Sequence, residues 1–262
     1  MKALITGASS GIGRDMARVL SAMGCDLILV ARRENRLKEL QNSLPTHSEI
    51  ICMDLSQKDA CLRLYRQVRD QQVDILINNA GFGVFGAFDK SALNKELDMI
   101  DVNIRAPHIL TKLFLRDFIR RDAGYILNVS SAAAFLPGPL LSAYYASKAY
   151  ILHLTEAVAE ELRQRGSRVY IGAFCPGPVG TEFDEKAGVH FSPASMSSTK
   201  AARYAIDGMF RRKTVIIPGL QMKLAHFAIR LLPDSTAVQI CYHMQHRKEG
   251  GKRGGFHTIQ GI

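Results

Sequence analysis

Short runs of apolar and β-branched residues alternate along the chain with longer stretches in which apolar side chains recur every three or four positions. The short runs are typical of buried strands, and the longer stretches are typical of helices with one face in a core. Strands are therefore expected at residues 3–6, 27–31, 50–53, 75–77, 125–129, 168–174 and 215–217. Helices are expected near residues 12–24, 34–43, 57–71, 92–121, 143–165 and 198–212.

This alternation predicts an α/β fold, a Rossmann-like doubly wound parallel sheet of about seven strands with helices on both faces. No repeat or linker divides the chain before position 195, so we expect a single domain over residues 1–262. Residues 182–199 mix glycine, proline and serine with apolar side chains and predict a substrate lid. A C-terminal helical extension is expected over residues 219–248, and the glycine-rich residues 249–262 predict a disordered tail.

The charge of the chain is concentrated near its end. The formal net charge is +10, and residues 200–262, with eleven Lys and Arg against three acids, carry +8 of it. A basic segment can bind nucleic acid, an anionic membrane surface or anionic small molecules. No motif that reads nucleic acid accompanies this segment, so we expect no nucleic-acid partner.

The basic extension also has an amphipathic pattern. One predicted helical face comprises Leu220, Leu224, Phe227, Ala228, Leu231 and Leu232. Such a helix can lie on an anionic membrane, cover a substrate pocket or join two subunits. We favour packing of this helix on its own domain, with its basic residues solvated, over peripheral membrane contact.

Cysteine usage and the first residues bear on the compartment. The five cysteines are odd in number and form no CxxC pair, which argues for a reducing environment. The first apolar run ends at Ile5, too early for a signal peptide, so we expect a cytoplasmic protein. His243 and His246 are three positions apart with only Cys241 nearby, so we predict no metal site.

A glycine-rich turn follows the first predicted strand. Between Thr6 and Gly13, glycines stand at positions 7, 11 and 13, and a helical pattern begins there. Glycine lets a backbone approach a pyrophosphate, and a helix start supplies N–H donors and a positive dipole end. The alternative is a strand-to-helix turn with glycines for packing, but the position in the chain favours a dinucleotide site.

Two arginines follow the second predicted strand, where folds that select NAD carry an acid. Arg32 and Arg33 can instead hold a 2′-phosphate through charged, bidentate hydrogen bonds, and Ser9 and Ser10 can add hydroxyl groups. The pattern predicts NADP(H) as the cofactor, and the alternative is a solvated basic turn.

The strongest local signal is Tyr144-Tyr145-Ala146-Ser147-Lys148 at the start of a long predicted helix. Tyr144 and Lys148 are four positions apart and share one helix face. A nearby ammonium group favours a phenolate and makes tyrosine a usable acid or base near neutral pH. Ser131 ends the fifth predicted strand, thirteen positions before Tyr144.

Together these motifs resemble the short-chain dehydrogenase/reductase family, in its short, single-domain, NADP(H)-preferring branch. The resemblance runs from Ala3 to about Thr181, and more loosely to about Pro218. The matching motifs are Thr6-Gly7-x-x-x-Gly11-x-Gly13, Asp54-Leu55, Asn78-Asn79-Ala80-Gly81, Asn103, Ser131, Tyr144-x-x-x-Lys148 and Pro176-Gly177-x-x-x-Thr181.

The resemblance implies a role for each position. Tyr144 would be the general acid in carbonyl reduction and the base in alcohol oxidation, Lys148 would lower its pKa and bind the nicotinamide ribose, and Ser131 would hydrogen-bond the substrate oxygen. Asn103 would interrupt its helix and hold a water in a proton relay to Lys148. The other cofactor-binding positions would be Gly7, Ser9, Ser10, Gly11, Ile12, Gly13, Arg32, Arg33, Asp54, Leu55, Asn79, Ala80, Gly81, Pro176, Gly177, Val179 and Thr181.

The family likeness also locates a substrate pocket. Its expected lining beside Ser131 is Ala133, Phe135, Leu141 and Phe183, with Phe82, Phe85 and Leu136 as further candidates. These side chains are apolar, so a hydrophobic ketone, 3-oxoacyl or steroid-like substrate is expected rather than a sugar, although each residue can equally belong to the core.

The leading function is an NADP(H)-dependent oxidoreductase, and the alternative is a non-catalytic NADP(H)-binding module that senses redox state. The family commonly pairs through its long helices, so a homodimer or homotetramer is expected, with residues 92–121 and 143–165 at the interface.

Overall fold

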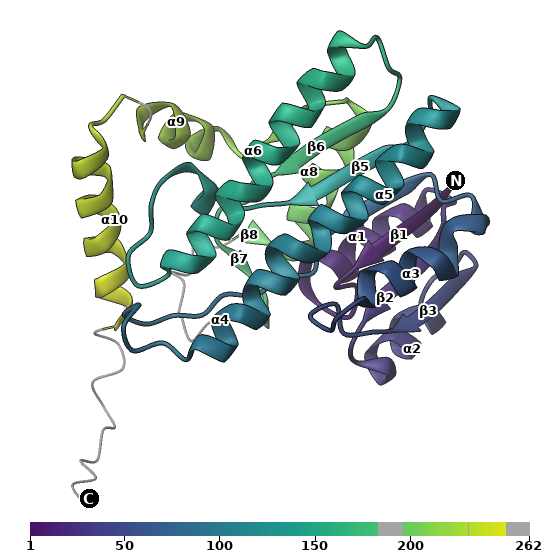
Figure 1. Ribbon diagram of the computed structural model, residues 1–262, viewed down its shortest axis with the longest axis horizontal. Coiled ribbons are helices and arrows are strands. Elements are labelled where there is room, and N and C mark those ends of the chain that lie inside the picture. Colours follow the sequence, from purple (N-terminus) through teal and green to yellow (C-terminus); the bar gives the residue numbers. More distant parts are fainter. Residues whose placement is uncertain (183–195, 230, 250–262) are drawn as a thin grey trace, which may run out of the picture.

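The central feature of the fold is a seven-stranded sheet in which neighbouring strands are parallel. The computed structural model describes residues 1–182, 196–229 and 231–249. Within them the sheet has the order β3-β2-β1-β4-β5-β6-β9 (Figure 1). Its strands are β1 (Lys2–Thr6), β2 (Asp26–Ala31), β3 (Ser48–Cys52), β4 (Ile75–Asn78), β5 (Tyr125–Val129), β6 (Tyr170–Phe174) and β9 (Val215–Ile216). The predicted doubly wound sheet is confirmed.

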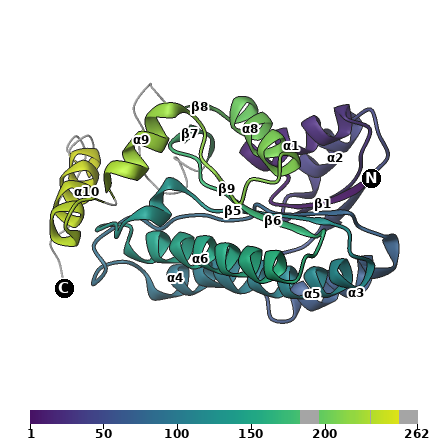
Figure 2. The ribbon, with the colours of Figure 1, turned by 90° about the horizontal axis from the view of Figure 1, so that it is seen from above.

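Helices cover both faces of this sheet, as Figure 2 shows. One face carries α1 (Gly11–Ala22), α2 (Glu34–Asn42) and α8 (Ser198–Phe210). The other carries α3 (Ala60–Val68), α4 (Leu93–Ile100), α5 (Ala106–Arg121) and α6 (Ser142–Gln164). Short 3-10 turns lie at Arg69–Gln71 and Ala132–Phe135.

Alternate residues of the strands supply two cores. In β1, Ile5 belongs to the core beneath α1 and α8, and Leu4 belongs to the core beneath α3 and α5. Successive side chains of a strand point to opposite faces, and both faces are covered here. This burial on both sides is why the strands read as continuous apolar runs in the sequence.

The strand order reverses beside β1, which places the candidate site. From β1 the chain moves outward through β2 and β3 and then returns to β4 on the other side of β1. In parallel α/β sheets, ligands bind outside the carboxyl ends of the strands at such a reversal. The ends of β1 at Thr6 and β4 at Asn78 therefore face the expected binding crevice.

The helix expected over residues 92–121 is interrupted. It consists of α4, a π-helical turn at Asp101–Arg105, and α5. Asn103 lies in the turn and is buried. A π turn inserts one residue and often marks a functional site. The local helix break implied by the family likeness is thus present, although the apolar pattern alone does not reveal it.

The C-terminal extension forms two helices, α9 (Leu220–Ile229) and α10 (Asp234–Glu249), at one end of the molecule (Figure 1). Of the predicted lid, residues 183–195 lie outside the described residues. Its end is regular structure: β8 (Met196–Ser197) pairs with β7 (Val179–Gly180), and α8 begins at Ser198. Residues 250–262 of the predicted tail also lie outside the described part of the chain.

Helix α9 packs on its own domain, with the ring centroid of His226 3.9 Å from that of Phe135, but it does not use the leucine face. Leu220, Leu224 and Phe227 are 72%, 61% and 64% exposed. The helix instead turns Met222, among other residues, toward a large cavity. Between positions 220 and 229 the only Lys, Arg, Asp or Glu is Lys223, so α9 is apolar on most sides and the pattern cannot distinguish its buried face.

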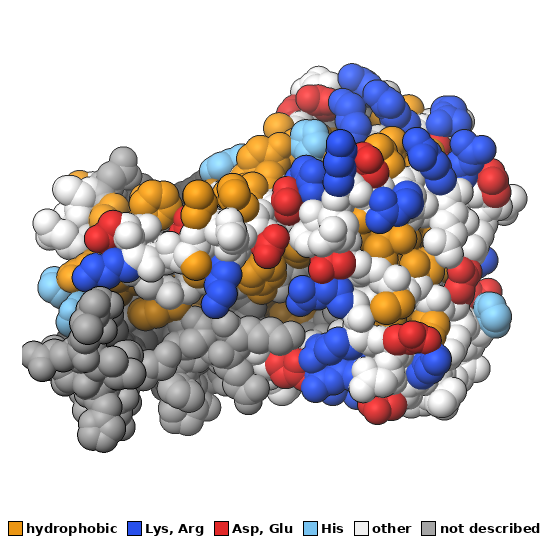
Figure 3. Space-filling model, turned by 60° about the horizontal axis from the view of Figure 1, so that its bottom comes forward, with side chains coloured by type: hydrophobic (Ala, Val, Ile, Leu, Met, Phe, Trp, Pro, Cys, Tyr) orange, Lys and Arg blue, Asp and Glu red, His pale blue; other side chains and the backbone are white. Residues whose placement is uncertain are grey.

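The surface differs between the two ends of the molecule. On the face shown in Figure 3, the charged side chains of the described residues, of both signs, gather mainly on the half away from α10. Within the described residues, no helix combines the length and apolar character needed to cross a membrane.

Candidate active site

The carboxyl ends of β1 and β4 are joined by Asn79. Its Nδ2 donates to the carbonyl oxygens of Thr6 (3.0 Å) and Gly7 (3.1 Å). Gly7 has a φ of +68°, and a Cβ on Gly13 would lie 2.5 Å from the Gly7 oxygen. Because only glycine fits here, the backbone can turn sharply from β1 into α1. The glycines thus serve packing, and Gly7 and Gly11 also line the cavity described below.

Helix α1 begins at Gly11 without a side-chain cap. Ser10 occupies the N-cap position, but its hydroxyl accepts a hydrogen bond from Arg33 (2.9 Å) instead of a helix N–H. The first N–H groups of a helix and its positive dipole end attract anions. The start of α1 is therefore suited to an anionic group.

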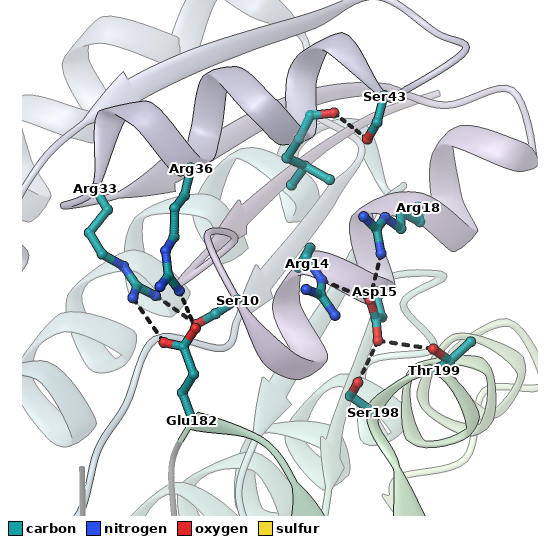
Figure 4. A network of polar contacts seen from close by, with 11 residues as sticks. Ser10, Arg14, Asp15, Arg18, Arg33, Arg36, Ser43, Glu182, Ser198 and Thr199 are labelled. Carbon is teal, nitrogen blue, oxygen red and sulfur yellow. Dashed lines mark hydrogen bonds and ion pairs between the residues drawn. The ribbon is translucent and has the colours of Figure 1, made fainter. Parts of the chain in front are cut away.

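Two arginines converge on one carboxylate beside this helix start (Figure 4). Arg33 donates to Ser9 Oγ (3.2 Å), Ser10 Oγ (2.9 Å) and Glu182 Oε2 (2.8 Å). Arg36 pairs with the other oxygen of the Glu182 carboxylate. Partial burial acts to raise the pKa of Glu182, but the hydrogen bonds from Arg33 and Arg36 lower it to about 2.

Arg32 lies apart from this cluster. Its side chain is 62% exposed, and its Nη1 is 3.7 Å from Asp54 Oδ2. The sequence pattern pairs Arg32 with Arg33 and predicts neither Arg36 nor Glu182 at this site. Arg36 follows Arg33 by three positions at the start of α2, so helical spacing was a signal that could have identified it.

Lys148 is held in the interior on α6. Its Nζ donates to the carbonyl oxygen of Val129 at the end of β5 (3.0 Å). Burial lowers the pKa of Lys148 to about 8. The Nζ lies 5.8 Å from the ring centroid of Tyr144. At neutral pH the ammonium form still predominates, and its charge favours a phenolate at Tyr144.

Asn103 fixes the loop that follows β4. Its Nδ2 donates to the Phe82 carbonyl (2.9 Å) and to Ser147 Oγ (3.1 Å), and its Oδ1 accepts from the Phe82 N–H (3.1 Å). A Cβ on Gly81 would lie 3.0 Å from Asn103 Oδ1 and 3.2 Å from Lys148 Nζ. The π turn, the β4 loop and the ammonium group therefore meet at one point.

Ser131 and Tyr144 stand on neighbouring segments. Ser131 follows β5, and its Oγ accepts from the N–H of Ala133 (3.1 Å) at the start of a 3-10 turn. Tyr144 lies in the first turn of α6 and is 9% exposed. Both line the same cavity as Lys148. This arrangement offers a hydroxyl, a phenol and an ammonium group to one bound molecule.

The cavity has a volume of about 1070 Å³. It brings together most of the residues predicted from the sequence, from the glycine-rich turn to the loop after β6. The predicted residues that line it are Gly7, Ser9, Ser10, Gly11, Ile12, Arg32, Arg33, Asp54, Leu55, Asn79, Ala80, Gly81, Ser131, Ala133, Phe135, Leu141, Tyr144, Lys148, Pro176, Gly177, Val179 and Thr181. Gly13 and Asn103 are not among the lining residues, although Asn103 bonds to the backbone of Phe82, which is. Phe183 lies outside the described residues.

The C-terminal helices complete the cavity wall, a contribution that sequence reasoning left open. Helix α9 contributes Met222 and Ile229, and α10 contributes Ile240 and Gln245. Gln245 Nε2 makes a hydrogen bond to the hydroxyl of Tyr145, and burial raises the pKa of that tyrosine. The extension therefore covers the apolar part of the cavity.

Comparison with known proteins adds an independent finding. The sequence pattern of the short chain dehydrogenase family matches residues 1–190. A short chain dehydrogenase from Pseudocercospora fijiensis is 36% identical over 187 residues, which are 69% of this chain and 60% of that protein. The chain thus spans less than two thirds of this relative.

Solved structures are also similar. A short-chain dehydrogenase from Sphingobium yanoikuyae in complex with NADPH has a TM-score of 0.80 and 28% identity, covering 100% of this chain and 98% of that one. A bulky-bulky ketone specific alcohol dehydrogenase from Comamonas testosteroni has a TM-score of 0.74 and 26% identity, covering 99% and 96%. The sheet order, the π turn, the glycine-rich turn and these matches agree, and the chain belongs to the short-chain dehydrogenase/reductase family.

Proposed function

We propose that the protein is an NADP(H)-dependent oxidoreductase that interconverts a carbonyl group and a secondary alcohol on a hydrophobic small molecule. One observation carries this proposal. A single cavity is lined by the glycine-rich turn, by Ser131, Tyr144 and Lys148, and by apolar side chains. Dinucleotide, proton donor and hydrophobic substrate can therefore meet in one space.

The residues divide the chemistry as follows. A bound nicotinamide cofactor supplies or takes up a hydride. The Tyr144 hydroxyl gives a proton to the carbonyl oxygen during reduction and accepts one during oxidation. Lys148 favours the phenolate, and Ser131 hydrogen-bonds the substrate oxygen. Asn103 acts as a positioning residue, because it ties the β4 loop to Ser147, next to Lys148.

The chain's own groups fit a dinucleotide. Gly7 and Gly13 leave no room for a Cβ, so the chain can turn tightly from β1 into α1, and Gly7 and Gly11 line the cavity. The uncapped start of α1 suits a pyrophosphate, and Arg33 with Ser9 and Ser10 offers donors for a 2′-phosphate. The NADPH complex of the Sphingobium yanoikuyae relative supports the same choice of cofactor.

Cofactor choice is tested at Arg33. Replacing Arg33 with alanine removes charged hydrogen bonds to a 2′-phosphate, so NADPH affinity is expected to fall by about 10- to 100-fold. NADH affinity is expected to change far less, because NADH has no such phosphate. Arg120→Ala is the matched control, since Arg120 is 74% exposed on α5, pairs with Asp117 and is not among the residues that line the cavity. If Arg33→Ala lost equal affinity for NADPH and NADH, Arg33 would not bind the 2′-phosphate.

The apolar part of the cavity favours a hydrophobic substrate. Phe82, Phe135, Leu141, Met222 and Ile240 all contribute to its wall. Such a lining binds hydrophobic rather than polyhydroxylated molecules. The likeness to the bulky-bulky ketone specific alcohol dehydrogenase from Comamonas testosteroni points the same way.

The activity is tested by following NADPH absorbance with ketones of increasing apolar size and with a sugar of equal size. We expect consumption of NADPH to be fastest with the larger apolar ketones and slowest with the sugar. Calorimetric NADPH binding serves as the control for a folded, cofactor-competent protein. Tight NADPH binding with no turnover of any carbonyl would favour the non-catalytic redox-sensing alternative.

Exposed apolar side chains on α4 support a homo-oligomer. Leu93, Leu97 and Ile100 are 66%, 49% and 38% exposed and follow one another at helical spacing. On α6, Tyr150 is 40% exposed. These helices lie on the same face of the sheet, as Figure 2 shows, which is consistent with pairing between copies of the chain.

A further inference from the structure

The anion site beside α1 is occupied by a group of the chain itself. Glu182 Oε2 lies 2.8 Å from Arg33 Nη1, and Oε1 is paired with Arg36 Nη1. The second terminal nitrogen of Arg33 donates to Ser9 and Ser10. Figure 4 shows both guanidinium groups turned toward the carboxylate. Donors suited to a phosphate thus surround a carboxylate instead.

A carboxylate and a phosphate compete for the same donors. The planar fork of arginine matches both groups through paired N–H bonds. The strongly lowered pKa of Glu182 keeps its carboxylate charged at neutral pH. The side chains of Arg33 and Arg36 are 31% and 40% exposed, and that of Glu182 is 33% exposed. Ion pairs with this degree of exposure are weak enough for a doubly charged phosphate to replace.

Glu182 reaches the cluster from a distant part of the chain. It is separated from Arg33 by 149 positions and follows Thr181, at the end of the segment after β7. A Cβ on Gly11 would meet the side chain of Thr181 at 3.2 Å, which places this segment against the start of α1. Glu182, Arg33 and Gly11 all line the same cavity. The carboxylate therefore lies within the space that a dinucleotide would enter.

We infer that Glu182 is a specificity-determining residue: its carboxylate is an internal competitor that the 2′-phosphate of NADP(H) displaces from Arg33 and Arg36. The inference rests on the proposed preference for NADP(H). NADH carries no phosphate at this position and binds without displacing the carboxylate. Glu182 therefore weakens NADP(H) binding selectively and narrows the discrimination between the two cofactors.

The test is the affinity of Glu182→Gln for each cofactor, measured by calorimetry because the chain has no tryptophan to report binding. We expect the NADPH dissociation constant to fall by about three- to tenfold, the gain from removing a competing state that is mostly populated. The NADH dissociation constant is expected to stay the same. Glu182→Ala is the second variant and is expected to show the same direction of change.

Glu34→Gln is the matched control. Glu34 lies on α2, as Arg36 does, but its carboxylate pairs with Lys38 (2.8 Å). This variant changes the net charge by the same amount without touching the cluster, so both affinities should stay near wild type. A gain in NADPH affinity equal to that of Glu182→Gln would mean that overall charge, and not competition, is responsible, and would overturn the inference.

Two further outcomes separate the inference from the proposed cofactor preference. If wild type binds NADPH better than NADH, but Glu182→Gln binds NADPH no better than wild type, Glu182 does not compete and the inference alone fails. In that case weaker binding by the variant would indicate that Glu182 instead holds Arg33 in place. If wild type and Arg33→Ala both bind the two cofactors equally, the NADP(H) preference fails and the inference fails with it.

Discussion

Replacing Tyr144 with phenylalanine is expected to lower kcat/KM for ketone reduction by about 10²- to 10⁴-fold, the contribution of a well-placed general acid. Tyr144 and Lys148 line the same cavity, and the Lys148 ammonium lies 5.8 Å from the centroid of the Tyr144 ring. The change deletes one oxygen from a side chain that is 9% exposed, so the packing of α6 stays intact. NADPH binding, measured by calorimetry, is expected to remain close to wild type.

Tyr145 provides a matched control from the next position. It lines the same cavity, but its hydroxyl bonds to Gln245 of α10. Tyr145→Phe is expected to reduce kcat/KM by no more than about fivefold, the value of one hydrogen bond. If Tyr144→Phe kept most of its activity, or if Tyr145→Phe lost as much, the proton donor would be a different group.

The sheet could be predicted from sequence because its strands are buried on both faces. The expected strand at residues 27–31 is Asp26–Ala31 in the structure, and the expected helix at residues 143–165 is Ser142–Gln164. The π turn escaped the pattern because apolar positions continue on both sides of it, from Met99 to Ala106. Periodicity reports which residues face a core, and it does not report a single inserted residue.

The site residues could be predicted from the sequence where the interacting groups lie close together along the chain. The glycine-rich turn and the Tyr144–Lys148 pair each lie within a few positions, so spacing alone places their groups together. The Glu182 contacts and the bond between Gln245 and Tyr145 join positions at least 100 apart. Such contacts depend on tertiary packing, which spacing along the chain does not reveal. The buried side of α9 could not be predicted either, because apolar side chains surround most of this helix.

Lys148→Met is expected to stabilise the cofactor-free protein at pH 7 while abolishing its activity. Burial lowers the pKa of Lys148 to about 8, from 10.5 in the unfolded chain. The native state therefore holds fewer protons than the unfolded state between these values, so this lysine makes stability rise with pH from about 8 to 10.5. Below pH 8 the folded protein bears the full free-energy cost of burying the charged lysine, which is about 3 kcal/mol for a pKa shift of this size.

Methionine keeps the length and the apolar stem of lysine but carries no charge to desolvate. The substitution removes the hydrogen bond from Nζ to the Val129 carbonyl. Leaving that oxygen unpaired destabilises the folded state by about 1 to 2 kcal/mol. The net gain in the free energy of unfolding at pH 7 is therefore about 1 to 2 kcal/mol. At pH 9.5 the gain should disappear, because the wild-type lysine is then mostly neutral in the folded state.

Urea unfolding of cofactor-free wild type and Lys148→Met at pH 7 and pH 9.5 measures this difference directly. Lys112→Met is the control, since Lys112 is exposed on α5 and its replacement should change stability by less than about 0.5 kcal/mol. A Lys148→Met protein that unfolds more easily than wild type at pH 7 would contradict a desolvation cost. A stabilised but inactive variant would show that the site retains a buried cation for chemistry at the expense of folding free energy.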